Sequence, residues 1–306
     1  MADIVKRGEY FAKVGYNRRI GEGFYKIGLE FEGAGAEAFG ELEPGQFAEL
    51  DLSKTAIPES IPEGLRDSSM RDILLRRPFG FSDVTFEGGV TKAEILYRTV
   101  GPASLRMMTF CAGETVSVIG PLGRGFWIEE GKRKAMVVIG GMGAGPLIHL
   151  AKVIRERKPA MEVTVFAGAR SKKNLPFENV SGDIGEGEGM WLEEFAQINV
   201  KSFVVTEDGS AGSKGFVTDG LSKRLAGGEV NSEDLTIYAC GPEGMLAKVT
   251  EIANEKGISC QVSMERRMAC GIGICQSCAV ESKVDGYKLC CQDGPVFDSA
   301  EVLFSE

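Results

Sequence analysis

The chain has 306 residues, of which 43% are hydrophobic and 26% are charged, a composition typical of a globular protein with more than one domain. The net charge of −9 at pH 7 argues against nucleic acid as a partner, because neutralising phosphates requires clustered lysine and arginine. The N-terminus lacks the apolar core of a secretory signal, and the longest apolar run, residues 135–151, contains four glycines and a proline. We therefore expect a cytoplasmic protein that does not interact with a membrane.

The first 130 residues are expected to form an antiparallel β-barrel. Short, partly alternating runs bounded by glycine and proline are typical of strands, and many such runs in succession are typical of a barrel. The predicted strands are Phe24–Phe31, Gln46–Leu52, Ala93–Arg98 and Thr115–Ile119. A stretch rich in proline and serine, residues 53–73, interrupts them and is predicted to be a surface loop.

After a charged link at residues 129–134, strands alternate with helices, which indicates a parallel α/β sheet. Continuous apolar runs predict strands at residues 135–139, 163–167, 200–205 and 235–239. Helices are predicted at residues 146–157, 192–197, 217–225 and 242–256. The remaining segment, from about residue 259, is short and rich in cysteine.

Two loops that follow predicted strands are candidates for nucleotide binding. The first, Ile139–Leu147 (IGGMGAGPL), opens a helix, so its amides and the helix N-terminus can hold a diphosphate. It departs from G-x-G-x-x-G because Pro146 replaces the last glycine, and a purely structural turn is the alternative. The second loop, Tyr238–Met245 (YACGPEGM), follows a later strand, and ligands of open α/β sheets bind beyond the carboxyl ends of the strands.

Two motifs in the β-rich part are candidates for phosphate binding. Arg76 and Arg77 precede Pro78 in the sequence LRRPFGFS, and arginine is suited to bidentate phosphate binding. A surface charge pair before a turn is an equally good interpretation. Residues 120–125 (GPLGRG) form a second candidate, whose backbone amides can bind phosphate or simply turn the chain.

The cysteines near the C-terminus predict an iron–sulfur cluster. Three of them have the C-x4-C-x2-C spacing of plant-type [2Fe–2S] proteins, and Gly271 and Gly273 allow the backbone to approach the inorganic sulfides. A fourth thiolate can come from either of two adjacent cysteines downstream. The candidate thiols are Cys270, Cys275, Cys278, Cys290 and Cys291.

Zinc is the main alternative for these thiols. Zinc ribbons usually carry two C-x2-C pairs, and only one such pair is present here, which favours the [2Fe–2S] cluster. A disulfide framework is not expected in an intracellular chain of this length. The remaining thiols, expected to be small buried side chains, are Cys111, Cys240 and Cys260.

In this order, the motifs resemble the ferredoxin–NADP reductase superfamily. Within it, residues 268–278 (MACGIGICQSC) and 291–297 (CQDGPVF) closely resemble the electron-transfer subunit family of B-type, NAD-linked dihydroorotate dehydrogenase. Residues 74–78, 96–101 and 120–126 fit the same family, and the resemblance runs from about residue 40 to the end. It implies an FAD-binding antiparallel β-barrel over residues 1–130, a parallel α/β NAD-binding domain over 131–257 and a small [2Fe–2S] domain over 258–306.

The resemblance also implies which residues contact the cofactors. FAD would contact Arg77, Pro78, Phe79 and Gly80, then Leu96, Tyr97 and Arg98, and then Ala103 and Ser104. The nicotinamide nucleotide would contact Gly140, Gly141, Gly143 and Pro146, and also Cys240, Gly241, Pro242 and Met245. The cluster ligands would be Cys270, Cys275, Cys278 and Cys291. Cys291 is preferred to Cys290 because it directly precedes the family's Asp-Gly-Pro-Val-Phe block.

Three features depart from the family's pattern. Gly80 stands where the family usually has Ser or Thr facing the flavin, so that hydrogen bond is missing or comes from Ser82 or the backbone. Ala103 and Ser104 replace a typical Gly-Thr pair, which leaves the FAD phosphate contacts open. The stretch at residues 53–73 is longer than the family leads us to expect, and it can shield the flavin or touch a partner.

The resemblance implies a division of labour between two subunits. Dihydroorotate would be oxidised on an FMN-containing catalytic subunit, within a heterotetramer that serves pyrimidine biosynthesis. This chain would pass the electrons singly through the cluster to FAD, and from FAD as a hydride to NAD+. Since cofactors supply this chemistry, no catalytic side chain is expected, and the only histidine, His149, is interpreted as an ordinary helix residue.

Several alternatives stay open. NAD is preferred on family grounds, but NADP is not excluded because Arg170, Lys172 and Lys173 can contact a 2′-phosphate. The same scaffold serves the flavin subunits of a bifurcating NADH–ferredoxin:NADP oxidoreductase and of a hydrogenase. The former usually has Asp at the first cluster position, so Cys270 favours the dihydroorotate family. A non-catalytic redox sensor that binds a cluster or zinc is an alternative of a different class.

Overall fold

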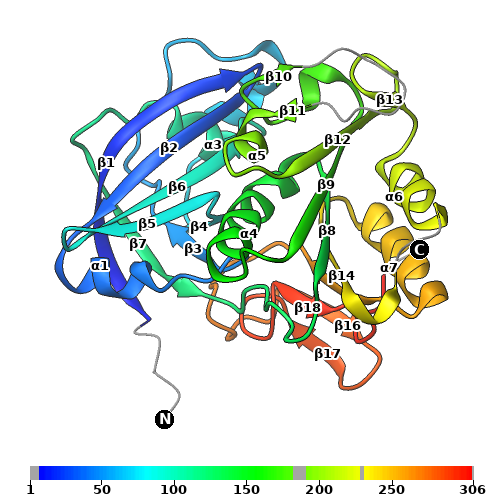
Figure 1. Cartoon of the computed structure of the whole chain (residues 1–306). Coiled ribbons are helices and arrows are strands. Elements are labelled where there is room, and N and C mark those ends of the chain that lie inside the picture. Colours follow the sequence, from blue (N-terminus) through cyan, green and yellow to red (C-terminus); the bar gives the residue numbers. More distant parts are fainter. Residues whose placement is uncertain (1–6, 182–190, 228–230, 305–306) are drawn as a thin grey trace.

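The computed structural model describes residues 7–181, 191–227 and 231–304 (Figure 1). The first part is one curled antiparallel sheet, a half-barrel with the strand order β4-β3-β7-β1-β2-β6-β5. Its strands are β1 Gly8–Gly21, β2 Phe24–Phe31, β3 Phe47–Leu50, β4 Arg77–Gly80, β5 Asp83–Glu87, β6 Val90–Arg98 and β7 Thr115–Leu122. Stacked rings of Phe31 and Phe39, with centroids 4.1 Å apart, lie in its core, and the predicted antiparallel β fold is confirmed.

Three short helical segments accompany the half-barrel. They are α1 Gly33–Gly40, α2 Arg66–Ser69 and α3 Pro102–Met107, with a 3₁₀ turn, η1 Glu63–Leu65, before α2. Residues 53–73, predicted to be a surface loop, contain η1 and α2 but no strand. Buried Leu52 and Ile73 anchor this stretch at its two ends.

The longest strand of the half-barrel, β1, is missed by the sequence prediction. Along β1, buried Ala12 and Val14 alternate with exposed residues, as expected for a strand with one solvated face. The exposed positions include charged side chains such as Arg18 and Arg19, so the segment lacks the apolar character by which strands are recognised. Its pairing with β2 and β7 places it in the middle of the sheet.

The second part is a parallel sheet between helices, as predicted. The strand order is β13-β12-β9-β8-β14-β15-β18, and β18 alone is antiparallel. The strands are β8 Lys134–Gly140, β9 Glu162–Ala169, β12 Lys201–Thr206, β13 Ser213–Lys214, β14 Leu235–Cys240, β15 Ser259–Ser263 and β18 Val296–Asp298. A two-stranded ladder, β10 Val180–Ser181 and β11 Trp191–Leu192, lies beside this sheet.

Helices cover both faces of the parallel sheet (Figure 1). Their bounds are α4 Ala144–Arg157, α5 Glu193–Ala196, α6 Val217–Ala226 and α7 Glu243–Lys256, with 3₁₀ turns η2 Gly141–Gly143, η3 Lys172–Asn174 and η4 Ser232–Asp234. Helices α4 and α5 pack on the face toward the half-barrel, in a core that includes Leu96 of β6 and Phe195 of α5. Helices α6 and α7 pack on the other face. The predicted strands and helices of this part are confirmed to within two residues.

The cysteine-rich segment follows β15 and lies below the sheet in Figure 1. It contains a hairpin of β16 Ala279–Ser282 and β17 Gly286–Leu289. Strands β15 and β18 both lie beyond residue 258, yet they pair in the parallel sheet. The three-domain division with boundaries at residues 130 and 257 stays a prediction.

Two further predictions can be compared with the structure. Cys240 and Cys260 are buried as expected, whereas Cys111, expected to be buried, is exposed in the turn before β7. Within residues 7–181, 191–227 and 231–304, none of the helices is both long and apolar enough to cross a membrane.

Candidate functional site

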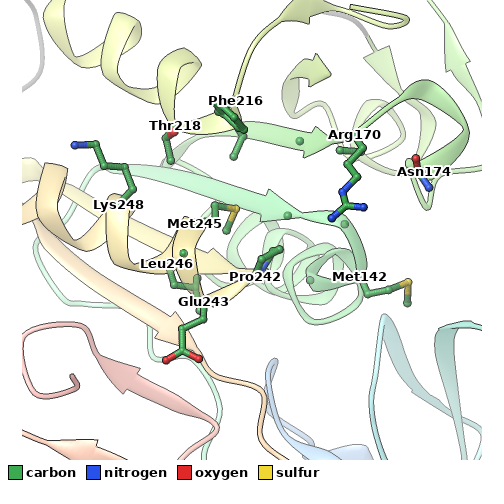
Figure 2. A pocket seen from close by; sticks show the side chains of 18 of the residues that line it. Met142, Arg170, Asn174, Phe216, Thr218, Pro242, Glu243, Met245, Leu246 and Lys248 are labelled. Carbon is green, nitrogen blue, oxygen red and sulfur yellow. The ribbon is translucent and has the colours of Figure 1, made fainter. Parts of the chain in front are cut away.

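The two predicted nucleotide loops converge on one cavity of about 960 Å³ at the carboxyl end of the parallel strands (Figure 2). The first loop follows β8 and the second follows β14, which are neighbouring strands. The predicted residues that line the cavity are Gly140, Gly141, Gly143, Gly241, Pro242 and Met245. Pro146, in the first turn of α4, and buried Cys240 lie behind the lining.

Glycine is required where the two loops touch. A Cβ on Gly143 would lie 2.1 Å from the Cys240 carbonyl oxygen, and one on Gly140 would lie 2.6 Å from Pro242 Cδ. No side chain fits between these loops, so their backbones approach each other directly. With the N-terminus of the 14-residue helix α4 beside them, they form an anion-binding surface suited to a nucleotide diphosphate.

Other lining residues were not predicted from the sequence. They are Gly168, Ala169, Asn174, Val205, Glu207, Phe216, Thr218, Glu243, Lys248, Glu265 and Arg266, among others, and Arg98, which was predicted to contact FAD, lines the cavity as well. Arg170, noted for a possible 2′-phosphate, lines the cavity, whereas Lys172 and Lys173 do not. Figure 2 shows Arg170 and Lys248 on opposite sides of the cavity. These positions lie at the ends of separate strands, so the chain order alone does not indicate that they meet.

A bidentate ion pair connects the cavity to the cysteine-rich segment. Both terminal nitrogens of Arg266 donate to the Glu243 carboxylate at 3.0 Å. Glu243 opens helix α7 beside the second nucleotide loop, and Arg266 lies four residues before Cys270. The two predicted sites are therefore joined by a charge-assisted contact.

The predicted FAD strand is β4, which pairs with β3. Arg77 donates only to the carbonyls of Leu75 and Arg76 and forms no ion pair with the described residues. Arg76, in contrast, donates to Glu9 at 2.6 Å and to Ser117. Arg77 is thus the arginine of the pair that can bind a phosphate.

The space for the missing serine or threonine is open at Gly80. A Cβ there would meet only the Gln46 carbonyl oxygen, at 4.0 Å. Ser82, one predicted source of the replacement hydrogen bond, is buried, and its hydroxyl donates to Glu94 at 2.8 Å. The backbone amide of Ser82 also donates to Glu94, at its carbonyl oxygen, at 2.8 Å.

The other predicted FAD residues have varied surroundings. Tyr97 points into the half-barrel core, where it donates to Asn17 at 2.9 Å, and Leu96 packs toward α4. Arg98 is exposed and lines the nucleotide cavity. At the start of α3, the hydroxyl of Ser104 accepts from the Val100 amide at 2.9 Å, while Pro78 and Phe79 are partly buried on β4.

The cysteine loop is shaped by two glycines with left-handed backbones. Gly271 has φ +66° and Gly273 has φ +87°. A Cβ on Gly273 would lie 2.2 Å from Gln292 Oε1, and one on Gly271 would lie 2.7 Å from Glu49 Cγ. Glycine is therefore needed at both positions for conformation and for space.

The thiols lie in two neighbouring pairs. The Cys275 amide donates to Cys270 Sγ at 3.4 Å, and hydrogen bonds from Ser277 and Cys270 lower the Cys275 pKa to about 6. Cys291 lies beside Cys278, and burial, followed by the hydrogen bond with Cys278, raises its pKa to about 12. Two pairs of thiols suit a cluster that contains two irons. Among the described residues, no three His, Cys, Asp or Glu side chains lie close enough together to hold a single metal ion.

Cys290 has a different environment from Cys291. Its thiol is fully buried and donates to the Met264 carbonyl at 3.1 Å, and burial raises its pKa. The Met264 carbonyl lies at the end of β15, so this contact holds Cys290 toward the sheet. The residues present fit a [2Fe–2S] cluster with Cys291 as the fourth thiolate.

One buried carboxyl group lies between the predicted FAD strand and the cysteine loop. Glu49 of β3 is 1% exposed, its backbone is paired with Pro78 of β4, and its side chain lies against Gly271. Burial raises its pKa to about 7. The contact places the cysteine loop one strand away from β4.

His149 lies on α4 and does not line the cavity. It is 3% exposed, and burial lowers its pKa to about 4. The imidazole is therefore neutral at pH 7.

Comparison with known proteins identifies both halves of this site. Residues 265–303 match the family described as the iron-sulfur cluster binding domain of dihydroorotate dehydrogenase B, and residues 137–251 match the oxidoreductase NAD-binding domain. The electron transfer subunit of dihydroorotate dehydrogenase B (NAD(+)) from Caldanaerobacter subterraneus subsp. tengcongensis is 33% identical over 296 residues, which cover 96% of this chain and 98% of that protein.

Two solved structures have the same fold. An NADH-dependent reduced ferredoxin-NADP oxidoreductase has a TM-score of 0.72 and 26% identity, covering 96% of this chain and 90% of that chain. A ferredoxin NADP+ reductase from Neisseria gonorrhoeae with bound FAD and NADP has a TM-score of 0.56 and 13% identity, covering 85% of this chain and 95% of that chain.

These findings confirm the predicted fold class, an iron–sulfur cluster and NAD as cofactors, and an oxidoreductase function in electron transfer. They also favour the iron–sulfur cluster over zinc at the cysteine loop. With full-length similarity at 33% identity, the chain belongs to the family of the electron transfer subunit of NAD(+)-linked dihydroorotate dehydrogenase B.

Proposed function

We propose that this chain connects an FMN-containing dihydroorotate dehydrogenase catalytic subunit to NAD+ in the cytoplasm, within a heterotetramer that serves pyrimidine biosynthesis. The contact between Glu49 and Gly271 carries this proposal, because it puts the cysteine loop next to the pair of strands that includes β4. The nucleotide cavity, strand β4, which would hold FAD, and the cysteine loop, which would hold the cluster, are then arranged in the order in which electrons would pass between them. The name of the relatives, an electron transfer subunit, supports a separate catalytic partner.

Different residues of this chain would hold each cofactor in its own place. Arg77, whose guanidinium donates to backbone carbonyls and to no carboxylate of the described residues, would bind an FAD phosphate, and Phe79 and Gly80 would leave room for the flavin on β4. Gly140, Gly143 and Gly241 would hold the NAD diphosphate on their backbones. When bound, the cluster would carry single electrons and FAD would exchange a hydride with the nicotinamide.

The cysteine loop would hold the cluster through Cys270, Cys275, Cys278 and Cys291. The depressed pKa of Cys275 favours the thiolate that binds iron. The raised pKa of Cys291 in the absence of iron means that metal binding would displace its proton. Cys290 would keep its proton, because its thiol is committed to the Met264 carbonyl.

An anaerobic visible spectrum, recorded before and after one equivalent of NADH, tests the proposal. We expect a flavin band and a broad cluster absorbance, both of which NADH bleaches. Addition of the catalytic subunit with dihydroorotate should then reduce NAD+. A protein that binds neither flavin nor iron would contradict the proposal.

A second candidate is supported by the similarity to the NADH-dependent reduced ferredoxin-NADP oxidoreductase. In that case the chain would exchange electrons with ferredoxin, and it would serve a different partner subunit. The same preparation distinguishes the two. Reduction by dihydroorotate with its catalytic subunit favours the first candidate, and efficient NADH-dependent reduction of ferredoxin without that subunit favours the second.

A further inference from the structure

A buried cluster of charges joins the half-barrel to the α/β half, at the end of the molecule away from the cysteine-rich hairpin (Figure 1). Its centre is the ammonium group of Lys26 on β2, a residue that is 5% exposed. Lys26 Nζ lies 3.6 Å from Glu94 Oε1, 3.0 Å from Glu178 Oε1 and 3.4 Å from Glu194 Oε1. Glu94 is on β6 of the half-barrel, whereas Glu178 precedes β10 and Glu194 is on α5.

Hydrogen bonds fix these carboxylates in place. Both terminal nitrogens of Arg18, on β1, donate to Glu178, at 2.7 and 2.5 Å. The Glu178 amide donates to Glu194 at 3.2 Å, and the Tyr16 hydroxyl donates to Glu94 at 2.6 Å. The second oxygen of Glu194 is buried and has no partner among the described residues.

The half-barrel and the α/β half hold different parts of the reaction. The nucleotide cavity is lined mainly by the α/β half, and of the half-barrel residues that the structure describes only Arg98 lines it, whereas the predicted FAD strand belongs to the half-barrel. The distance between nicotinamide and flavin is therefore set by the contact between the halves. An ion cluster with directional hydrogen bonds allows fewer arrangements than an apolar contact, and buried ions are costly unless paired.

The cations of the other charged contacts between the halves are more exposed than Lys26. Lys152 pairs with Asp83 at 2.7 Å and Arg157 pairs with Glu43 at 3.0 Å, and both pairs are accessible to solvent, which weakens them. Near the cysteine-rich segment, backbone hydrogen bonds take over. The Arg124 amide donates to the Gly294 carbonyl at 2.5 Å, and residues 124 and 295 form a β-bridge.

We propose that Lys26 is a positioning residue for hydride transfer, because it holds Glu178 and Glu194 of the α/β half against Glu94 of the half-barrel. The inference rests on the proposed function. Removing the Lys26 charge would leave Glu94 and Glu194 facing each other without a cation, while Arg18 still pairs with Glu178. Repulsion between these carboxylates would shift the α/β half on the half-barrel at this end. The backbone bonds at the other end would keep the cysteine loop in place. Hydride transfer should then suffer, while each cofactor still binds within its own half.

The test compares the wild-type holoprotein with Lys26→Met, Lys26→Arg and Lys134→Met. Lys134 is a matched control, because its ion pair with Glu162 joins two neighbouring strands of one sheet. For each protein we would measure FAD and iron content, the KM for NADH, and the rate of flavin bleaching by NADH and by 4-deuterated NADH in stopped flow. Reoxidation of the reduced flavin through the cluster by a one-electron acceptor would be followed as well.

In Lys26→Met we expect normal FAD and iron content, an unchanged KM and a hydride-transfer rate that falls about tenfold or more, with a larger deuterium isotope effect. Reoxidation through the cluster should stay near the wild-type rate. Lys26→Arg should recover most of the rate, and Lys134→Met should equal the wild type. A loss of thermal stability alone does not produce this combination of an unchanged KM and a slower hydride step.

Equal hydride rates in Lys26→Met and the wild type would overturn the inference, as would a proportional loss of NADH affinity and cofactor content. If Lys26→Met does not fold, Glu178→Gln replaces it, since Lys26 then keeps Glu94 and Glu194. A smaller fall in the hydride rate is expected there, and an unchanged rate would overturn the inference. Failure of the proposed function is distinguishable, because it would appear in the wild type, whose flavin would not be bleached by NADH or would not be reduced by dihydroorotate with the catalytic subunit.

Discussion

At the scale of single residues, chemically identical neighbours have different roles because of what their side chains contact. Cys290 and Cys291 are adjacent in the chain and both buried. The Cys290 thiol donates to the Met264 carbonyl, whereas Cys291 lies beside Cys278. These contacts favour Cys291 as the thiol that would join the others around a cluster.

Cys291→Ser should therefore abolish or destabilise the cluster, whereas Cys290→Ser should leave it largely intact. A serine hydroxyl at position 290 can still donate to Met264, while a serine at 291 removes a thiolate ligand of iron. Iron and acid-labile sulfide content of the two purified variants, together with their visible spectra, is the measurement. Equal loss of iron in both variants would refute the assignment of Cys291.

The adjacent arginines of the RRPFG segment differ in the same way. Arg76 is held by Glu9 and Ser117, whereas Arg77 contacts only nearby carbonyls through its side chain. Arg77→Ala should weaken FAD binding by about ten- to a hundredfold, because a hydrogen bond to a charged group contributes roughly 1.5–3 kcal/mol.

Flavin retained after gel filtration, followed by titration of the apoprotein with FAD, measures this effect. Arg76→Ala is the matched control, and it should retain FAD because Arg76 is committed to the half-barrel. Unchanged FAD affinity in Arg77→Ala, or an equal loss in both variants, would count against the proposed phosphate contact.

At the scale of elements, the loops after β8 and β14 act together because their backbones touch. A Cβ on Gly143 would lie 2.1 Å from the Cys240 carbonyl oxygen, so Gly143→Ala must push the two loops apart. Overpacking of this kind typically costs about 1–3 kcal/mol, and the diphosphate surface would be distorted. We expect a KM for NADH that rises roughly tenfold or more, with FAD and iron content unchanged.

Gly145→Ala provides the comparison. Gly145 is in the same loop and the first turn of α4, but a Cβ there meets only ordinary contacts, at 3.9 Å from Leu96 and 4.0 Å from Ser82. NADH titrations of both variants, monitored by flavin absorbance, give the measurement. A wild-type KM in Gly143→Ala would show that the approach of the loops is not needed for nucleotide binding.

At the scale of the whole molecule, the ion cluster around Lys26 makes the contact between the halves sensitive to acid. Hydrogen bonds from Arg18 and then Lys26, together with their charges, lower the Glu178 pKa from 4.5 to about 2. A carboxyl group whose pKa is lower in the folded protein stabilises it above the pKa of the unfolded chain. That stabilisation is lost as the pH falls from about 4.5 toward 2.

The thermal midpoint of the wild type should therefore fall steeply between pH 4.5 and pH 2. Glu178→Gln should have a lower midpoint at neutral pH and a shallower decline over this range, because its side chain cannot titrate. Calorimetric scans of both proteins across the pH series measure the difference. Parallel curves for the two proteins would exclude Glu178 as a source of the acid sensitivity.

Much of the fold could be predicted because the sequence patterns that indicate its strands and helices lie within short segments of the chain. The alternation of apolar strands and helices from Lys134 onward identified the parallel sheet, and the predicted bounds of α7 nearly coincide with those observed. Strand β1 was missed because its exposed face is rich in charged residues, and only pairing with β2 and β7 makes it a central strand. Strand β18 joins the parallel sheet through β15, which nothing in its three residues indicates.

The sequence by itself determined the chemistry: the spacing of Cys270, Cys275 and Cys278 and the glycines after β8 identify an iron–sulfur site and a nucleotide loop, because these patterns depend on neighbouring residues. The tertiary structure decided which residues can act. It pairs Arg76 with Glu9, whereas Arg77 donates only to backbone carbonyls among the described residues, and it brings Lys26 to Glu194, 168 residues away. Contacts of this kind depend on how distant segments pack, and packing depends on the whole chain rather than on any local pattern.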